Sequence, residues 1–96
     1  MDKEVRVRTR ISGRDFIMPT WIREILGWKS YEVLFFRLKD TEIEVTKSDG
    51  YTTRMVKSRI HIPVDIARAL NIKDGDIVEL IPKEGGTLII KKVSQK

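Results

Sequence analysis

The chain has 96 residues, with 19 Lys and Arg against 14 Asp and Glu, one His and no Cys. The absence of Cys excludes disulfides and thiolate sites, and a single His argues against a zinc site. The formal net charge of +5 favours an anionic partner, although a soluble surface rich in Lys gives the same balance. No apolar run approaches the ~20 residues of a membrane span, and residues 1–4 lack the order of a signal peptide. We therefore expect a cytoplasmic protein with no membrane partner.

Residues 5–11 alternate strictly between two kinds of side chain, which predicts a β-strand. One face of this strand carries three arginines: Arg6, Arg8 and Arg10. Like charges on one face repel each other, so this face requires water or an anion beside it. Two interpretations remain open, namely contact with nucleic-acid phosphates and a solvated face close to the acids of residues 1–4.

A turn over residues 12–15, which contains the basic Arg14, leads through a short apolar strand to a helix over residues 19–26. Pro19 suits the start of a helix, because the first helical residues need no N–H donor. Three apolar residues recur at helical spacing, and we expect them to face the core: Ile22, Ile25 and Leu26.

Two tryptophans lie on or beside this helix. Trp21 and Trp28 each neighbour an apolar cluster, so we expect packing for both, with stacking on single-stranded bases as the alternative. Arg23 falls on another part of the helix surface.

Strands and turns follow as far as residue 50. Residues 33–38 are apolar on both faces except at Arg37, which predicts a central strand. Residues 42–47 alternate and predict a further strand. Residues 48–50 form a connection that is too short for two freely moving domains.

The second half of the chain repeats this order of elements. Residues 51–56 and 60–62 predict strands, and Pro63 begins a helix whose apolar face consists of Ile66, Ala69 and Leu70. Two more strands are predicted, at residues 77–81 and 87–90, followed by a basic tail. His61 is expected to point outward, and a lone His of this kind is more often structural than catalytic.

The two halves align at a constant offset of 44 residues, which places Pro19 on Pro63. The same offset places several identical residues on each other: Arg10 on Arg54, Ile22 on Ile66, Leu26 on Leu70 and Lys29 on Lys73. Two copies indicate a duplication and not a solenoid. One copy of ~44 residues is too small to bury its own apolar faces, so we expect residues 1–48 and 49–96 to form one intertwined domain.

The second copy, VKSRIHIPVDIARALNIKDGDIVELIPKEGGTLIIKK, resembles the AbrB-type swapped-hairpin DNA-binding family, also called SpoVT/AbrB-like or looped-hinge helix proteins. The resemblance rests on the Ile-Pro pair, the Ile-x-x-x-Leu helix, the Lys-Asp-Gly-Asp turn and the last apolar strand. The first copy, RISGRDFIMPTWIREILGWKSYEVLFFRLKDTEIEVTK, departs at Tyr31, where the family usually has Gly. The resemblance implies a mostly β fold with two short helices, in which tandem ββαββ repeats interleave as a swapped-hairpin, pseudo-dimeric barrel.

The resemblance also implies a double-stranded DNA-binding transcriptional regulator or nucleoid-type protein. Members contact DNA through basic residues on the first strands, their turns and the start of the helix, and Arg suits both phosphate and guanine. The corresponding residues here are Arg6, Arg8, Arg10, Arg14 and Arg23 in the first copy, and Arg54, Lys57, Arg59 and Arg68 in the second. Because the first copy has three arginines on its first strand, we expect that copy to make more of the DNA contact.

Other classes of function remain open. Many members of the family are antitoxins, in which a flexible C-terminal extension grips a toxin, and this sequence ends soon after its last predicted strand. The alternative is therefore an antitoxin-like or other protein-binding module without its toxin-gripping tail, whose partner would be a toxin or another regulator. A purely structural domain is a further alternative. A fragment of a larger regulator, or a further homo-oligomer, is compatible with each of these. We find no Gly-rich phosphate loop, no nucleophile with a base and no calcium loop, so we expect no enzymatic activity, no cofactor and no metal.

Overall fold

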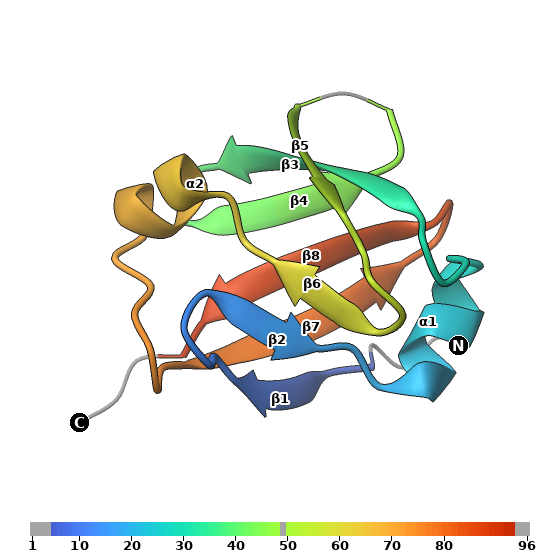
Figure 1. Cartoon of the computed structure of the whole chain (residues 1–96), viewed down its shortest axis with the longest axis horizontal. Helices are drawn as coiled ribbons and strands as arrows, with labels where there is room; N and C mark the ends of the chain where they lie inside the picture. The colour runs from blue at the N-terminus through green and yellow to red at the C-terminus, as the bar shows by residue number, and fades with distance from the viewer. Residues whose placement is uncertain (1–4, 49, 94–96) are drawn as a thin grey trace.

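The computed structural model describes residues 5–48 and 50–93. Its elements are, in chain order, β1 (Val7–Arg10), β2 (Asp15–Ile17), α1 (Thr20–Leu26), β3 (Val33–Lys39), β4 (Glu42–Thr46), β5 (Tyr51–Arg54), β6 (Arg59–His61), α2 (Val64–Ala69), β7 (Ile77–Lys83) and β8 (Thr87–Lys92) (Figure 1). The protein is mostly β with two short helices, which confirms the predicted class.

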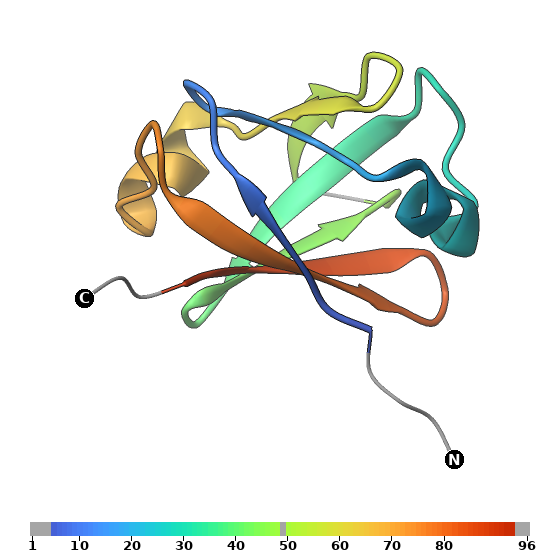
Figure 2. The ribbon, with the colours of Figure 1, turned by 90° about the horizontal axis from the view of Figure 1, so that it is seen from below.

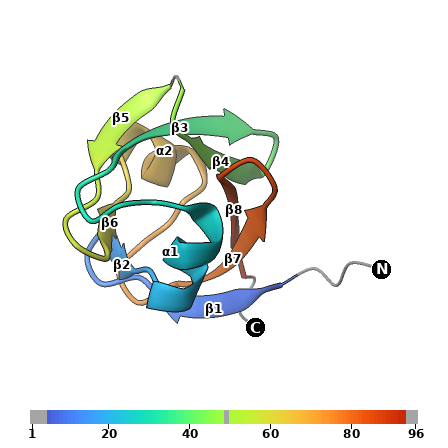
Figure 3. The same ribbon diagram turned by 90° about the vertical axis from the view of Figure 1, so that its right-hand side faces the viewer.

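The strands form two antiparallel sheets. Six strands make one sheet in the order β1-β7-β8-β4-β3-β5, and β2 and β6 pair separately as a two-stranded ribbon. Figure 3 shows the large sheet curling around the interior while the ribbon lies across the remaining side, between β1 and β5. The sequence predicts a barrel. In the structure the edge strands of the large sheet, β1 and β5, do not pair with each other, and the separate ribbon lies between them.

The two halves of the chain exchange their first strands. β1 pairs with β7 of the second half, with Val7 opposite Leu80, and β5 pairs with β3 of the first half. The ribbon also joins the halves, because Phe16 of β2 lies opposite Ile60 of β6. Both sheets thus contain strands from both halves.

The spacing of the elements follows the offset seen in the sequence. β5, β6 and β7 begin at residues 51, 59 and 77, each 44 residues after the starts of β1, β2 and β3. The equivalent turns also agree, since Ser12 bridges to Asp15 as Val56 bridges to Arg59. The strand starts and the turn bridges therefore follow the same offset of 44 residues.

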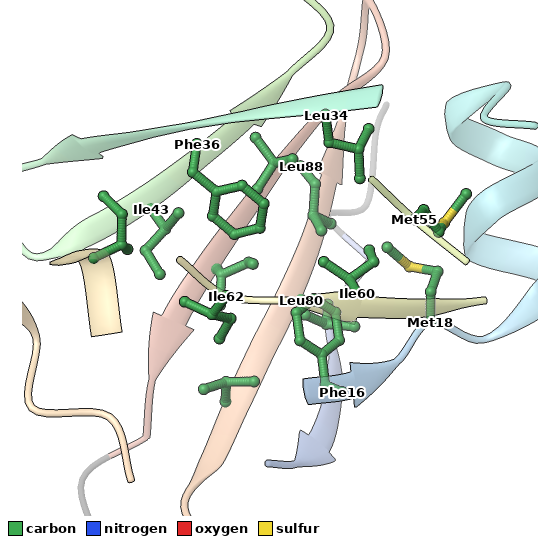
Figure 4. Close-up of a cluster of buried hydrophobic side chains, with 14 of the residues drawn as sticks. Phe16, Met18, Leu34, Phe36, Ile43, Met55, Ile60, Ile62, Leu80 and Leu88 are labelled. Carbon is green, nitrogen blue, oxygen red and sulfur yellow. The ribbon is translucent and has the colours of Figure 1, made fainter. Parts of the chain in front are cut away.

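The core fills the space between the curled sheet and the ribbon (Figure 4). Alternate residues of each strand point inward, so the ribbon contributes Phe16 and Ile60, while the sheet contributes Phe36 and Leu80. These side chains are 0–1% exposed, and each stabilises the fold by about 1.5–3 kcal/mol relative to an exposed position. In the described ranges no polar or charged residue is buried.

The two helices are short, and each packs through one narrow edge. Pro19 and Pro63 are the N-cap residues of α1 and α2, so each helix begins one residue later than predicted. Gly27 ends α1 in the left-handed conformation. Ile22 and Leu26 are buried, but Ile25 is 57% exposed, which contradicts its predicted place in the core. Ile25 lies about 100° around the helix from Leu26, and a helix of seven residues covers the sheet with one side only.

The packing predictions for Trp28, Trp21 and the apolar face of α2 are confirmed only in part. Trp28 is buried and donates its Nε1–H to the carbonyl of Gly86 at 3.1 Å, as a packing residue. Trp21 is 47% exposed, so its predicted packing role is wrong. In α2 the buried residues are Ile66 and Ala67, while Ala69 faces solvent.

Candidate nucleic-acid interface

One side of the molecule consists of the ribbon with a hairpin turn at each end (Figure 2). Phe16 and Ile60 point into the core, so their neighbours in β2 and β6 point outward. We use the term ribbon face for those outward residues together with the turns at 12–14 and 56–58; the outward residues are Asp15, Ile17, Arg59 and His61.

Each turn is a two-residue hairpin closed by reciprocal backbone hydrogen bonds. In the first turn Ser12 and Asp15 donate to each other at 2.8 and 2.9 Å, and in the second Val56 and Arg59 do so at 3.0 and 2.9 Å. Such a turn favours Gly at its first central position, where φ is positive. Gly13 holds that position in the first turn with φ 69°, but Lys57 holds it in the second with φ 58°.

A side chain from another part of the chain holds each turn in place. An acidic side chain holds the first turn, and a basic side chain holds the second. The backbone N–H of Gly13 donates to the Asp74 carboxylate at 2.7 Å. The second turn is held by Arg23 of α1, which donates from Nη1 to the carbonyl of Lys57 at 3.3 Å and to the Ser30 hydroxyl at 3.4 Å. Arg23 therefore positions the second turn, in addition to any contact that it makes with a ligand.

The outward arginines at β1 are not equivalent to one another: Arg8 and Arg10 belong to the strand, and Arg6 directly precedes it. Arg6 and Arg8 share the carboxylate of Glu79, with N–O distances of 3.0 and 3.8 Å. Their side chains are 46% and 66% exposed, so these ion pairs add little stability. They do, however, neutralise part of the positive charge of β1.

Arg10 and Arg54 occupy equivalent places in the two halves and face no acid. Arg10 lies opposite Ile77 in β7, and Arg54 lies opposite Val33 in β3. Both side chains are exposed, and within residues 5–48 and 50–93 neither forms an ion pair. These two guanidinium groups are therefore available to an external anion.

The remaining candidates divide between the ribbon face and α2. Arg14, Lys57 and Arg59 belong to the turns or the ribbon, with Arg14 half-buried and the other two exposed. Arg68 is exposed on α2 and lies outside the ribbon face as defined here. The fold thus places five cations in the ribbon, in its turns and at the ends of the strands that lead into them: Arg10, Arg14, Arg54, Lys57 and Arg59.

A pairing within the ribbon was missed by sequence reasoning. His61 Nδ1 lies 2.5 Å from Asp15 Oδ1, at the position that mirrors the Ile17–Arg59 pair. The two residues are 46 positions apart in the chain, and only the ribbon register brings them together. Ile17 and Val56 are also about half exposed beside the second turn, so this surface carries apolar contacts as well as charge.

Residues 57–96 match the model of a family described as "Antidote-toxin recognition MazE, bacterial antitoxin", which belongs to the AbrB/MazE-like swapped-hairpin superfamily. The match begins at the tip of the second hairpin turn and runs through α2, β7 and β8. No curated protein and no solved structure matches the chain.

The charged side chains of the ribbon turns and of the strand ends that lead into them are mainly cations. No group of three or more His, Cys, Asp or Glu side chains suited to a metal ion occurs in the part of the chain that the structure describes. Neither α1 nor α2 is long and apolar enough to cross a membrane. The exposed cations, by contrast, suit phosphate oxygens, which Arg binds in a bidentate manner.

Proposed function

We propose that this protein binds double-stranded DNA through the ribbon face, as a regulator of transcription or a nucleoid-type protein. The observation that carries the proposal is the position of Arg10, Arg14, Arg54, Lys57 and Arg59 in the ribbon, in its turns and at the strand ends leading into them. Phosphate contacts of this kind position a protein on a duplex, and the half-exposed apolar residues beside them offer contacts to base edges or thymine methyl groups.

The proposal includes the organisation of the chain. Residues 1–48 and 49–96 are the two repeats of one intertwined domain, a pseudo-dimer within a single chain. The recurrence of strand starts at the same offset and the exchange of β1 and β5 between halves support this division. The second repeat contains the whole of the family match, at residues 57–96.

The size of the molecule suits a short duplex site. Its longest Cα extent is 31 Å, while one turn of B-DNA spans about 34–36 Å. One chain therefore covers slightly less than one helical turn, and a 24-base-pair probe leaves room on both sides.

The test is a salt titration of binding to a fluorescent 24-base-pair duplex of random sequence, followed by anisotropy. If each of the five cations meets one phosphate, the slope of log K against log salt is about −4.5. The affinity should then fall about 500-fold between 50 and 200 mM KCl. No binding at 50 mM KCl, or an affinity that salt leaves unchanged, would contradict the proposal.

Matched triple variants separate this surface from net charge. Arg10→Gln, Arg54→Gln and Arg59→Gln together remove three charges at the proposed interface. Lys39→Gln, Lys83→Gln and Lys91→Gln remove three at the β3–β4 turn, the β7–β8 hairpin and the outer face of β8. We expect the arginine triple variant to abolish most binding at 100 mM KCl, while the lysine triple variant retains it. Equal losses would indicate attraction by net charge alone.

Binding of a protein partner is the second candidate, because the family that residues 57–96 match is described as an antitoxin family. In that case the partner would be a toxin, and substitutions confined to the ribbon face would leave its binding intact. Co-purification with a co-expressed toxin candidate, repeated with the arginine triple variant, distinguishes a toxin-binding surface from the DNA-binding surface.

A further inference from the structure

A surface hollow of about 270 Å³ lies between β1 and the ribbon, and it is lined by one arginine from each half of the chain. Arg10 comes from β1 and Arg59 from β6, and the hydroxyl-bearing Thr9 and Ser12 line the same hollow. Both arginines are exposed. Across the described ranges neither guanidinium has a hydrogen-bond acceptor or an acid as its partner.

Two guanidinium groups at one hollow repel each other unless an anion lies between them. Asp15 also lines the hollow, but its Oδ1 lies 2.5 Å from His61 Nδ1, so that carboxylate already has a partner. The volume far exceeds the ≈ 30 Å³ share of one water molecule. It accommodates a phosphate group, whose oxygens Arg binds through two parallel N–H bonds.

The offset of 44 residues predicts an equivalent site beside β5, but the residues there differ. The offset of 44 places Arg54 at the position of Arg10, while Asp15 and Arg59 take each other's positions. Arg59 lines the hollow beside Arg10. Val56 replaces Ser12 and is 51% exposed. The second position thus has an exposed apolar side chain where the first has a hydroxyl group, which is less favourable for phosphate.

We propose that Arg10 and Arg59 together form a phosphate-binding site that the fold builds from both halves, and that its equivalent beside Arg54 is weaker because Val56 replaces Ser12 there. This inference rests on the proposed function, since the phosphate is that of the DNA backbone. The duplex is consequently held asymmetrically, with its tightest backbone contact on one side of the ribbon. This site needs Arg59 of the second half. The number of arginines in the first half is therefore not enough to predict that the first half makes more of the DNA contact.

The experiment measures duplex affinity at 100 mM KCl for Arg10→Gln, Arg59→Gln, their double variant and Arg54→Gln. We expect each of the first two to weaken binding about tenfold, because the substitution breaks the same phosphate contact. The double variant should weaken binding about 20-fold rather than 100-fold, because two residues that share one partner are not additive. The salt slope should fall by about 1 in either single variant and by no more in the double variant.

Arg54→Gln is the matched comparison, and we expect it to weaken binding no more than about threefold. Lys39→Gln, on the far side of the molecule, should leave affinity unchanged. Thermal melting checks that each variant is folded, which the exposure of all these side chains favours. Two results would overturn the shared site but not the proposed DNA binding. One is an equal loss of affinity for Arg10→Gln and Arg54→Gln. The other is a loss in the double variant that equals the product of the losses in the two single variants. Absence of salt-dependent binding in the unmodified protein would instead remove the proposed function and this site with it.

Discussion

Gly50 lies at the point where the chain passes from its first half to its second, and the structure leaves no room there for a side chain. A Cβ atom at this position would lie 2.5 Å from the carbonyl oxygen of Phe36 and 2.8 Å from Cγ of Arg37. The backbone φ of Gly50 is 137°, a value that residues other than Gly rarely adopt. The carbonyl belongs to β3, and the Phe36 side chain is fully buried, so this neighbour cannot move aside at low cost.

We therefore expect Gly50→Ala to lower the free energy of unfolding by about 2–4 kcal/mol. Backbone strain contributes about 1–3 kcal/mol, and overpacking against β3 contributes a similar amount. The stiffer unfolded chain of the variant returns about 0.4–1 kcal/mol. For a domain of this size the melting temperature should fall by roughly 10–30 °C.

Gly85→Ala provides the matched control. Gly85 also has a positive φ, of 82°, but nothing lies within 4 Å of the Cβ position. Its substitution should cost about 1–2 kcal/mol from the backbone alone. Thermal and urea unfolding, followed by circular dichroism, measure both variants. If Gly50→Ala and Gly85→Ala unfold at the same temperature, the chain between the halves is not held against β3, and the steric reasoning fails.

Three further predictions follow from the contacts described above. Lys57→Gly relieves a strained turn position, so urea unfolding should show a free energy of unfolding that is unchanged or higher by up to about 1 kcal/mol. The salt slope of duplex binding should fall by about 1. A loss of stability would show that the Lys57 side chain packs in the fold. Trp28→Phe removes the hydrogen bond to the Gly86 carbonyl and should lower the free energy of unfolding by about 1–3 kcal/mol. Trp21→Phe should change it by no more than about 0.5 kcal/mol. A larger loss for Trp21→Phe than for Trp28→Phe in urea unfolding would contradict the burial of these two side chains. Residues 1–48 alone should show no cooperative thermal transition, because β1 loses its partner β7; a folded, monomeric fragment would disprove the intertwined domain.

Local patterns in the sequence were enough to predict most of the elements. The strict alternation of residues 5–11 predicts a strand because side chains of a strand alternate between two faces. Pro19 and Pro63 mark the starts of both helices, since each fits the first turn without loss of a donor. The offset of 44 residues also came from the sequence alone, and the starts of three pairs of strands follow it. Membership of the whole chain in two tandem repeats stays a prediction, because the family match covers residues 57–96.

Burial on the short helices was predicted less well. Helical spacing places Ile22, Ile25 and Leu26 on one broad face, but how much of that face is covered depends on the sheet beneath it. Ile25 and Trp21 remain about half exposed because a helix of two turns meets the sheet along one edge. Trp28, just beyond the helix, is buried since β7 and β8 bring Gly86 within hydrogen-bond distance of its ring.

The candidate binding residues show most clearly which features the sequence determines and which the tertiary structure decides. The sequence determined that Arg6, Arg8 and Arg10 share one face of a strand, because alternation is a property of the local backbone. Only the tertiary structure decided that Glu79 neutralises the first two and that Arg10 remains available beside Arg59. Strand register between residues tens of positions apart sets those contacts, and the register depends on the packing of both halves around one core.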